Sequence, residues 1–233
     1  MDGPVVIITG AGRGIGRAAA VELGALGYRL TLVSRNQDEL AETARLAGGG
    51  LLVVADVREP DEVHHVFEST MQTYDGLDAI VHCAGLAPVR SIGEMTIEEW
   101  RDVIDTNLSS AFYLAHAAWR IFERQRSGVI VNISSQAARD PFPGFAAYGA
   151  AKAGLNLFGL SAAREGQKIG VRVHTIAPAA VETAMFRGIV PEAQYPREKA
   201  LAPADVARVI VQCVKGELAH TSGEVIYIHK VCE

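Results

Sequence analysis

Short runs of apolar, largely β-branched residues alternate with longer stretches of helical character along the whole chain. Because these short runs are apolar at consecutive positions, they are typical of strands buried on both faces, as in a parallel sheet between two helix layers. Seven runs qualify, at residues 5–9, 30–33, 51–55, 79–83, 129–133, 171–177 and 225–228. The pattern predicts a doubly wound α/β fold with seven parallel strands and helices on both faces.

The intervening stretches carry helix start and stop signals. Thr96 and Glu99 have the spacing of a capping box, and Asn36 and Pro203 are suited to begin two further helices. Gly27 follows the apolar-periodic stretch 15–26 and is suited to end it. Because no linker, repeat or composition shift divides the chain, we expect residues 1–233 to form a single domain.

Composition excludes several classes of protein. The AVILMFWYC set makes up 49% of the 233 residues, which excludes a disordered chain. The net charge is −5 and no dense basic run is present, so nucleic acid is not an expected partner. The odd count of 3 cysteines without C-x-x-C spacing favours a reducing, cytoplasmic location, and the start of the chain predicts neither export nor membrane spanning.

A glycine-rich turn connects the first predicted strand to the helix that follows it. The segment reads Thr-Gly-Ala-Gly-Arg-Gly-Ile-Gly at residues 9–16. Glycine permits a tight turn and close approach of the backbone to a pyrophosphate, whose charge the helix N-terminus stabilises. We therefore expect a bound dinucleotide, held by Gly10, Gly12, Gly14, Ile15 and Gly16.

The end of the second strand bears on which dinucleotide binds. An NAD-selective site usually offers a carboxylate there, whereas this chain has Ser34 and Arg35. A guanidinium pairs with the 2′-phosphate of NADP(H), and Arg13 is placed to reach the same phosphate. The pattern favours NADP(H) over NAD(H), although both arginines also suit a solvated surface. Asp56 and Val57, after the third strand, are suited to contact the adenine.

Tyr148 and Lys152 stand four residues apart at the predicted start of a helix, so their side chains project from one face. A neighbouring ammonium together with an oxidised nicotinamide would favour the phenolate form of a tyrosine and tune it for proton exchange near neutrality. Lys152 is also suited to hold the nicotinamide ribose.

Taken together, the motifs resemble the short-chain dehydrogenase/reductase family, in its compact single-domain branch, over essentially the whole chain. They are the glycine-rich turn, Asp56-Val57, His-Cys-Ala-Gly at 82–85, Asn107, Ser134-Ser135, Tyr148 with Lys152, and Pro178 with Thr183. The resemblance implies a catalytic set of Asn107, Ser135, Tyr148 and Lys152, in which the family's spacing selects Ser135 over Ser134. It also implies cofactor contacts at Ala84, Gly85, Pro178, Val181 and Thr183.

The implied roles follow from the chemistry. Tyr148 would protonate a carbonyl oxygen as hydride arrives, or deprotonate the alcohol in reverse, while Ser135 fixes that oxygen. Asn107 would hold a water that links Lys152 to solvent. The alternatives are that Asn107 bonds locally within a kinked helix and that Ser135 is a polar strand end.

Two positions depart from the family pattern. His82-Cys83 replaces Asn-Asn, so one amide that supports the central sheet and another near the cofactor are absent, and Ala179 replaces a glycine that tolerates positive φ. His82 and Cys83 point to opposite faces of a strand, so no metal site is expected. The loops after the fourth to sixth strands predict a mostly apolar substrate pocket, with Leu86, Val89, Gln136, Ala137, Phe142, Phe145, Ala180, Val181, Met185 and Phe186 and with charges only at Arg90, Arg139 and Asp140.

We therefore expect an NADP(H)-dependent carbonyl reductase or alcohol dehydrogenase. A catalytically quiet NADP(H)-sensing protein is the alternative, and a sugar-nucleotide epimerase or dehydratase is the least favoured because little chain follows Pro203. The resemblance also implies a homodimer or homotetramer. The helix after Tyr148 carries small residues suited to such packing or to packing within the chain, at Gly149, Ala153, Gly154, Gly159 and Ala163.

Overall fold

A computed structural model describes residues 3–231. One parallel sheet contains all seven strands, in the order β3-β2-β1-β4-β5-β6-β7. The strands are β1 Val5–Thr9, β2 Arg29–Ser34, β3 Leu51–Val54, β4 Ala79–His82, β5 Gly128–Ile133, β6 Val171–Pro178 and β7 Val225–Ile228. Each predicted strand is present, with ends that differ from the prediction by at most one residue.

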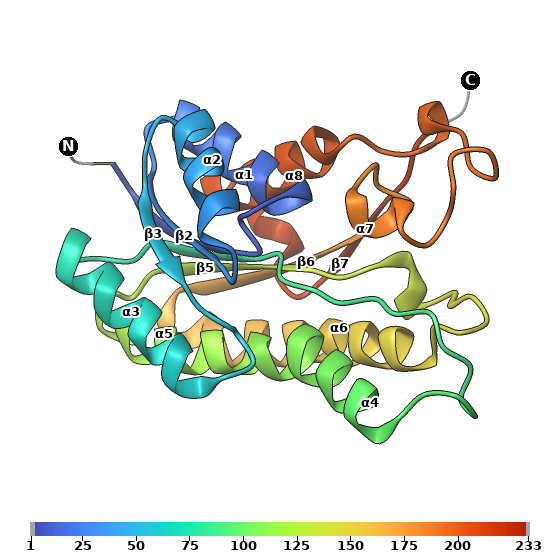
Figure 1. Ribbon diagram of the computed structural model, residues 1–233. Helices are drawn as coiled ribbons and strands as arrows, with labels where there is room; N and C mark the ends of the chain where they lie inside the picture. The colour runs from blue at the N-terminus through green and yellow to red at the C-terminus, as the bar shows by residue number, and fades with distance from the viewer. Residues whose placement is uncertain (1–2, 232–233) are drawn as a thin grey trace.

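Helices cover both faces of the sheet (Figure 1). One layer holds α1 Gly14–Ala25, α2 Gln37–Ala47 and α8 Pro203–Lys215, and the other holds α3 Pro60–Tyr74, α4 Ile97–Ile104, α5 Ser110–Gln125 and α6 Ala146–Gly166. The short helix α7, Ala184–Arg187, lies in the connection between β6 and α8. Among residues 3–231, no helix has both the length and the apolar character needed to cross a membrane.

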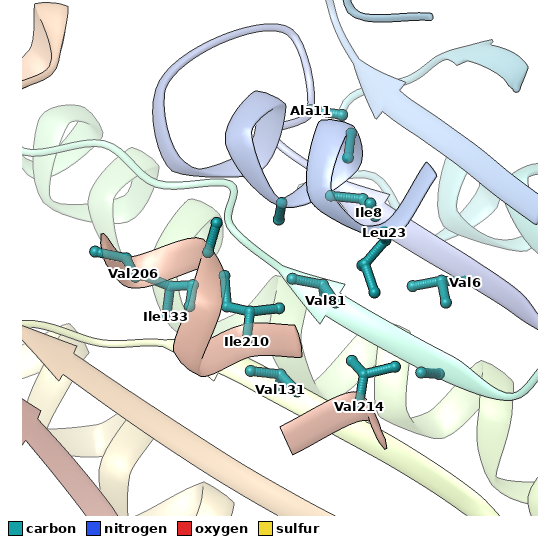
Figure 2. Close-up of a cluster of buried hydrophobic side chains, with 14 of the residues drawn as sticks. Val6, Ile8, Ala11, Leu23, Val81, Val131, Ile133, Val206, Ile210 and Val214 are labelled. Carbon is teal, nitrogen blue, oxygen red and sulfur yellow. The ribbon is translucent and has the colours of Figure 1, made fainter. Parts of the chain in front are cut away.

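Two apolar cores fill the space between the sheet and its helix layers. Figure 2 shows the first, where Ile8, Val81 and Val131 of the strands meet Leu23 of α1 and Ile210 of α8. Because adjacent strand residues point to opposite faces, their neighbours along the chain enter the second core against α3, α5 and α6. The strands are thus apolar on both faces because each face packs against a helix layer, as their sequence predicted.

The strand order reverses between β1 and β4, because the chain builds outward from β1 first to one edge and then to the other. Such a switch point leaves a crevice at the carboxyl ends of the strands, where α/β proteins bind ligands. The loops that follow β1, β4, β5 and β6 all lie at this edge.

The predicted helix signals are confirmed. Asn36 caps α2 by accepting a hydrogen bond from the Glu39 backbone N–H at 3.0 Å. Thr96 and Glu99 form the complete capping box of α4. Between α4 and α5, however, residues Asp105–Ser109 form a π-helical turn, which the sequence did not predict and which contains Asn107.

Candidate active site

A cavity of about 1110 Å³ opens at the carboxyl ends of the strands. Every residue predicted to bind cofactor lines it, together with Ser135 from the predicted catalytic set. The cofactor group comprises Gly10, Gly12, Arg13, Gly14, Ile15, Gly16, Ser34, Arg35, Asp56, Val57, Ala84, Gly85, Tyr148, Lys152, Pro178, Val181 and Thr183. Asn107 is not part of the lining and lies behind it. The structure therefore brings residues from the whole length of the chain to one site.

Two positions of the glycine-rich turn, Gly10 and Gly16, leave no room for a side chain. Gly10 has φ +63°, and a methyl group built on it would lie 2.7 Å from the backbone nitrogen of Ala84. A methyl group on Gly16 would lie 2.3 Å from the carbonyl oxygen of Gly10. The bare backbone that results, ahead of the N-terminus of α1, is the arrangement that fits a pyrophosphate.

Charged side chains gather where this cavity passes the end of β2. Asp56 forms a bidentate ion pair with Arg58, whose Nη2 lies 2.7 Å from Asp56 Oδ2. Arg35 lies 3.6 Å from the same carboxylate and keeps a side chain that is 70% exposed. The hydrogen bond from Arg58 lowers the pKa of Asp56. The Asp56 carboxylate is therefore ionised and paired with both arginines.

Ser135, Tyr148 and Lys152 converge on one wall of the cavity. Tyr148 and Lys152 project from the first turns of α6, and the Lys152 Nζ lies 5.7 Å from the centre of the Tyr148 ring. The Ser135 hydroxyl accepts a hydrogen bond from the Ala137 N–H at 3.1 Å and lies near enough to Tyr148 to affect its pKa. Ser134 is turned away, because its hydroxyl donates to the Lys152 carbonyl oxygen at 3.3 Å. Both serines line the cavity, and the choice of Ser135 over Ser134 stays a prediction that this difference in contacts favours.

Burial sets the proton affinities of this cluster. It lowers the pKa of Lys152 to about 8, while Lys152 Nζ donates to the Ile133 carbonyl oxygen at 2.8 Å. Burial also raises the pKa of Tyr148, and the neighbouring Ser135 side chain acts in the opposite direction. Lys152 is not among the groups that shift the pKa of Tyr148 in the described chain, so the expected joint effect of the ammonium and an oxidised nicotinamide stays a prediction.

Asn107 is held rigidly by the π-helical turn. Its Nδ2 donates to the carbonyl oxygens of Leu86 at 2.8 Å and Val103 at 2.9 Å, and its Oδ1 accepts from the Leu86 N–H at 3.3 Å. A methyl group on Gly85 would lie 3.1 Å from Asn107 Oδ1 and 3.8 Å from Lys152 Nζ. The side chain therefore both bonds within its kinked helix and reaches the neighbourhood of Lys152.

His82 completes a buried hydrogen-bonded chain beneath the cavity. The Ser110 hydroxyl donates to the Thr106 carbonyl oxygen at 2.8 Å, so His82 Nε2–H must donate to Ser110 Oγ at 3.0 Å. Thr9 Oγ1 then donates to His82 Nδ1 at 2.8 Å and accepts from the Ala84 N–H. The chain links β1, β4 and α5 and assigns His82 as a neutral imidazole.

The other departures from the family pattern do not strain the site. Cys83 points to the opposite face from His82 and lines the cavity, and burial raises the pKa of its thiol to about 12. Among residues 3–231 only Asp75 and Arg126 combine positive φ with a side chain, so Ala179 adopts its conformation without strain. No group of three potential metal ligands occurs in this described part of the chain.

The substrate side of the cavity is walled by aromatic rings. Phe142, Phe145 and Tyr148 stack in sequence, with ring centres 5.9 and 5.4 Å apart. On the opposite wall Phe186 packs edge-on against Tyr195. The predicted loop residues line the cavity except for Leu86, Arg90 and Arg139, and the guanidinium of Arg139 instead lies 4.3 Å from the centre of the Tyr227 ring.

An ion pair secures the loop that carries Phe186 and Tyr195. Arg187 donates to both carboxylate oxygens of Glu182, at 3.0 and 2.5 Å, and to the Tyr195 carbonyl oxygen at 2.8 Å. Sequence reasoning missed this pair and the lining residues Ile189, Val190 and Tyr195, because no motif marks them. It also missed Glu39, which lines the cavity beside Ser34 and which no motif marks.

These features define a dinucleotide-binding oxidoreductase of the doubly wound α/β class. A family model described as short chain dehydrogenase matches residues 4–194. The chain is 33% identical to the 3-oxoacyl-(acyl-carrier-protein) reductase FabG of Escherichia coli, over 98% of this chain and 96% of the relative. It is equally identical to 3beta-hydroxysteroid dehydrogenase 1 of Eggerthella lenta, over 98% and 93% of the two chains.

Solved structures agree with this assignment. A structure described as a putative short-chain alcohol dehydrogenase from Sinorhizobium meliloti superimposes with a TM-score of 0.91 at 30% identity, covering 97% of this chain and 95% of the other. Levodione reductase superimposes with a TM-score of 0.90 at 25% identity, covering 97% and 96%. The chain belongs to the short-chain dehydrogenase/reductase family and is an oxidoreductase that acts on a carbonyl or alcohol group.

Proposed function

We propose that this chain is an NADP(H)-dependent oxidoreductase that moves a hydride between the nicotinamide and a carbonyl or secondary alcohol, with Tyr148 as the general acid and base. The observation that carries the proposal is the convergence of Ser135, Tyr148 and Lys152 on the cavity that also contains the glycine-rich turn. A catalytically quiet cofactor sensor has no need for this convergence.

Each residue has a role that its contacts support. When bound, the nicotinamide supplies or accepts the hydride, and its oxidised ring carries a positive charge. Ser135 positions the substrate oxygen and Tyr148 exchanges a proton with it. Lys152, whose pKa burial lowers to about 8, is proposed to replace the proton of Tyr148. The Asn107 carboxamide, which is held by the backbone of Leu86 and Val103, is proposed to support a solvent path behind Lys152.

The substrate is proposed to be an apolar or modestly polar carbonyl compound. Phe142, Phe145 and Phe186 give the cavity an apolar wall, and Asp140 is the one charged residue that the substrate-side loops contribute to its described lining. The proposal is tested by steady-state oxidation of NADPH, and separately of NADH, with aliphatic, aromatic and α-dicarbonyl compounds and β-ketoacyl thioesters. Turnover of any of them supports it, and tight cofactor binding without turnover of the whole panel contradicts it.

The preference for NADP(H) is proposed to depend on Arg35. Arg35→Asp replaces a cation that attracts the 2′-phosphate with an anion that repels it, so we expect the Kd of NADPH to rise about 100-fold. The Kd of NADH should change less than about threefold, because its ribose offers hydroxyls to the new carboxylate. Isothermal titration calorimetry measures both constants.

The control for that experiment is Arg45→Asp, which makes the same charge change on an exposed residue of α2 that lines no part of the cavity. It should leave both constants within about twofold of wild type, as expected for a screened surface charge. Equal losses of NADPH and NADH affinity in Arg35→Asp would contradict the assigned role.

We also propose that the protein is a homodimer or homotetramer that associates through α5 and α6. Phe112 and Leu157 are 52% and 65% exposed there, and burying their apolar area would stabilise an association through these helices. The predicted small residues Gly149, Gly154 and Gly159 instead pack within the chain, against Pro141, Leu108 and Thr175. Ala153, another of these small residues, is exposed on α6, so it could take part in the proposed association surface.

Leu157→Glu should convert the oligomer to monomers, because a charge would be buried in the interface without a partner. Sedimentation velocity measures the change in mass. Leu26→Glu is the matched control, since Leu26 is 53% exposed at the end of α1 in the other helix layer. If Leu157→Glu sediments like wild type, this surface is not the interface.

Two further expectations stand as proposals. We infer that residues 1–233 act as one cofactor-binding domain, supported by a single sheet that includes strands from residue 5 to residue 228. We also infer a cytoplasmic location, supported by Cys83 and Cys213, which are both free thiols.

A further inference from the structure

One carboxylate in the cofactor cavity has no role in the mechanism above. Glu39 lies in the first turn of α2 and lines the cavity together with Gly12, Ser34 and Arg35. A methyl group built on Gly12 would lie 2.7 Å from Glu39 Oε2 and 3.1 Å from Ser34 Oγ. The carboxylate therefore lies over the glycine-rich turn, at the end of the cavity assigned to the adenosine ribose.

The Glu39 side chain is not used to cap its own helix. In a capping box the third helical residue accepts a hydrogen bond from the backbone N–H of the cap, as Glu99 does for Thr96 at 3.0 Å. In α2 the Asn36 N–H instead donates to Ser34 Oγ at 3.3 Å. The Glu39 carboxylate is therefore available to a ligand.

The neighbouring cations do not neutralise it. Within residues 3–231, the Glu39 carboxylate has no hydrogen-bond partner and no cation within 4.0 Å. Arg17 donates instead to the carbonyl oxygens of Gly12 and Glu39, and Arg35 pairs with Asp56.

We propose that Glu39 sets the balance between the two dinucleotides, by accepting hydrogen bonds from the adenosine ribose hydroxyls of NAD(H) and repelling the 2′-phosphate of NADP(H). This inference rests on the proposed cofactor site. Arg35 and Arg13 attract the phosphate while Glu39 opposes them, so the pocket discriminates less sharply than its arginines alone would. The chain then accepts NADH as a second reductant.

The test is the Kd of NADPH and of NADH in wild type and in Glu39→Gln, measured by isothermal titration calorimetry. Removing one negative charge beside the 2′-phosphate should lower the Kd of NADPH about tenfold. The Kd of NADH should rise about threefold, because a ribose hydroxyl loses a charged acceptor. The ratio of the two constants therefore shifts in favour of NADPH by more than tenfold.

Asp38→Asn is the matched control, because it removes the same charge from the same helical turn at an exposed residue outside the cavity lining. It should move the ratio by less than about twofold. The Glu39→Gln shift should also shrink as salt is raised from low to high concentration, which a packing effect would not do. Thermal unfolding of each variant checks that the fold is intact.

An unchanged ratio in Glu39→Gln, or an equal shift in Asp38→Asn, overturns the inference. Titration with 2′,5′-ADP and 5′-AMP, which lack the nicotinamide, localises any shift to the adenosine end of the cavity. Failure of the proposed function is separate, since it would be seen as absence of turnover by wild type on every carbonyl tested and would leave these binding constants unaffected.

Discussion

Tyr148→Phe should lower kcat for carbonyl reduction by about 1000-fold, within the range that general acid–base groups contribute. The substitution removes the hydroxyl that exchanges a proton with the substrate oxygen and keeps the ring that packs against Phe145. Because the ring stays in place, the Kd of NADPH should change less than about threefold. Steady-state kinetics and calorimetric titration of the purified variant measure the two effects.

Tyr113→Phe is the control, because Tyr113 lies in α5 and lines no part of the cavity. It removes the same hydroxyl group and should keep kcat within about twofold of wild type. A Tyr148→Phe variant that retained a tenth or more of the wild-type kcat would show that another group supplies the proton.

The second large effect concerns acid stability and depends on His82. Burial lowers the pKa of His82 to about 3, whereas an exposed histidine titrates near 6.5. The folded chain keeps His82 neutral while the unfolded chain takes up a proton, so its contribution is complete above about pH 6.5 and is lost as pH falls below it. The loss is about 1.4 kcal/mol per pH unit, or roughly 3 kcal/mol at pH 4.5.

Chemical denaturation at a series of pH values measures this slope. His82→Asn removes the titrating group. The slope of its unfolding free energy against pH, between pH 6.5 and 4.5, should therefore be smaller than in wild type by about 1.4 kcal/mol per pH unit, which corresponds to one proton. Burial also lowers the pKa of His174, to about 4, so His174 adds to the pH dependence of stability in wild type and in His82→Asn alike. Equal slopes in wild type and His82→Asn would show that His82 is already protonated in the fold.

Much of the fold is predictable from the sequence because its signals are local. Consecutive apolar residues such as Val5 to Ile8 indicate a strand buried on both faces, and Asn36 and Thr96 mark helix starts by their own hydrogen bonds. The cavity lining was predictable for a related reason, since the carboxyl ends of parallel strands meet at one edge.

The features that escaped prediction depend on contacts between distant segments. The π-helical turn around Asn107 adds a residue to a helix without changing its composition. The role of His82 as a bridge between Thr9 and Ser110 arises only when β1, β4 and α5 are packed together. Glu39 stands three residues after the helix cap Asn36, where a glutamate usually accepts a hydrogen bond from the backbone N–H of the cap. Here that N–H donates to the Ser34 hydroxyl instead, which the sequence does not reveal.

The central claim is that the chain moves hydride from the nicotinamide to a carbonyl carbon, and isotope transfer tests it most directly. Wild type is incubated with NADPH that carries deuterium at the transferable C4 position and with the carbonyl compound that it turns over fastest. The account predicts a product alcohol with one deuterium on the carbinol carbon, and almost none when Tyr148→Phe replaces wild type. Oxidation of NADPH without deuterium in the alcohol would contradict it.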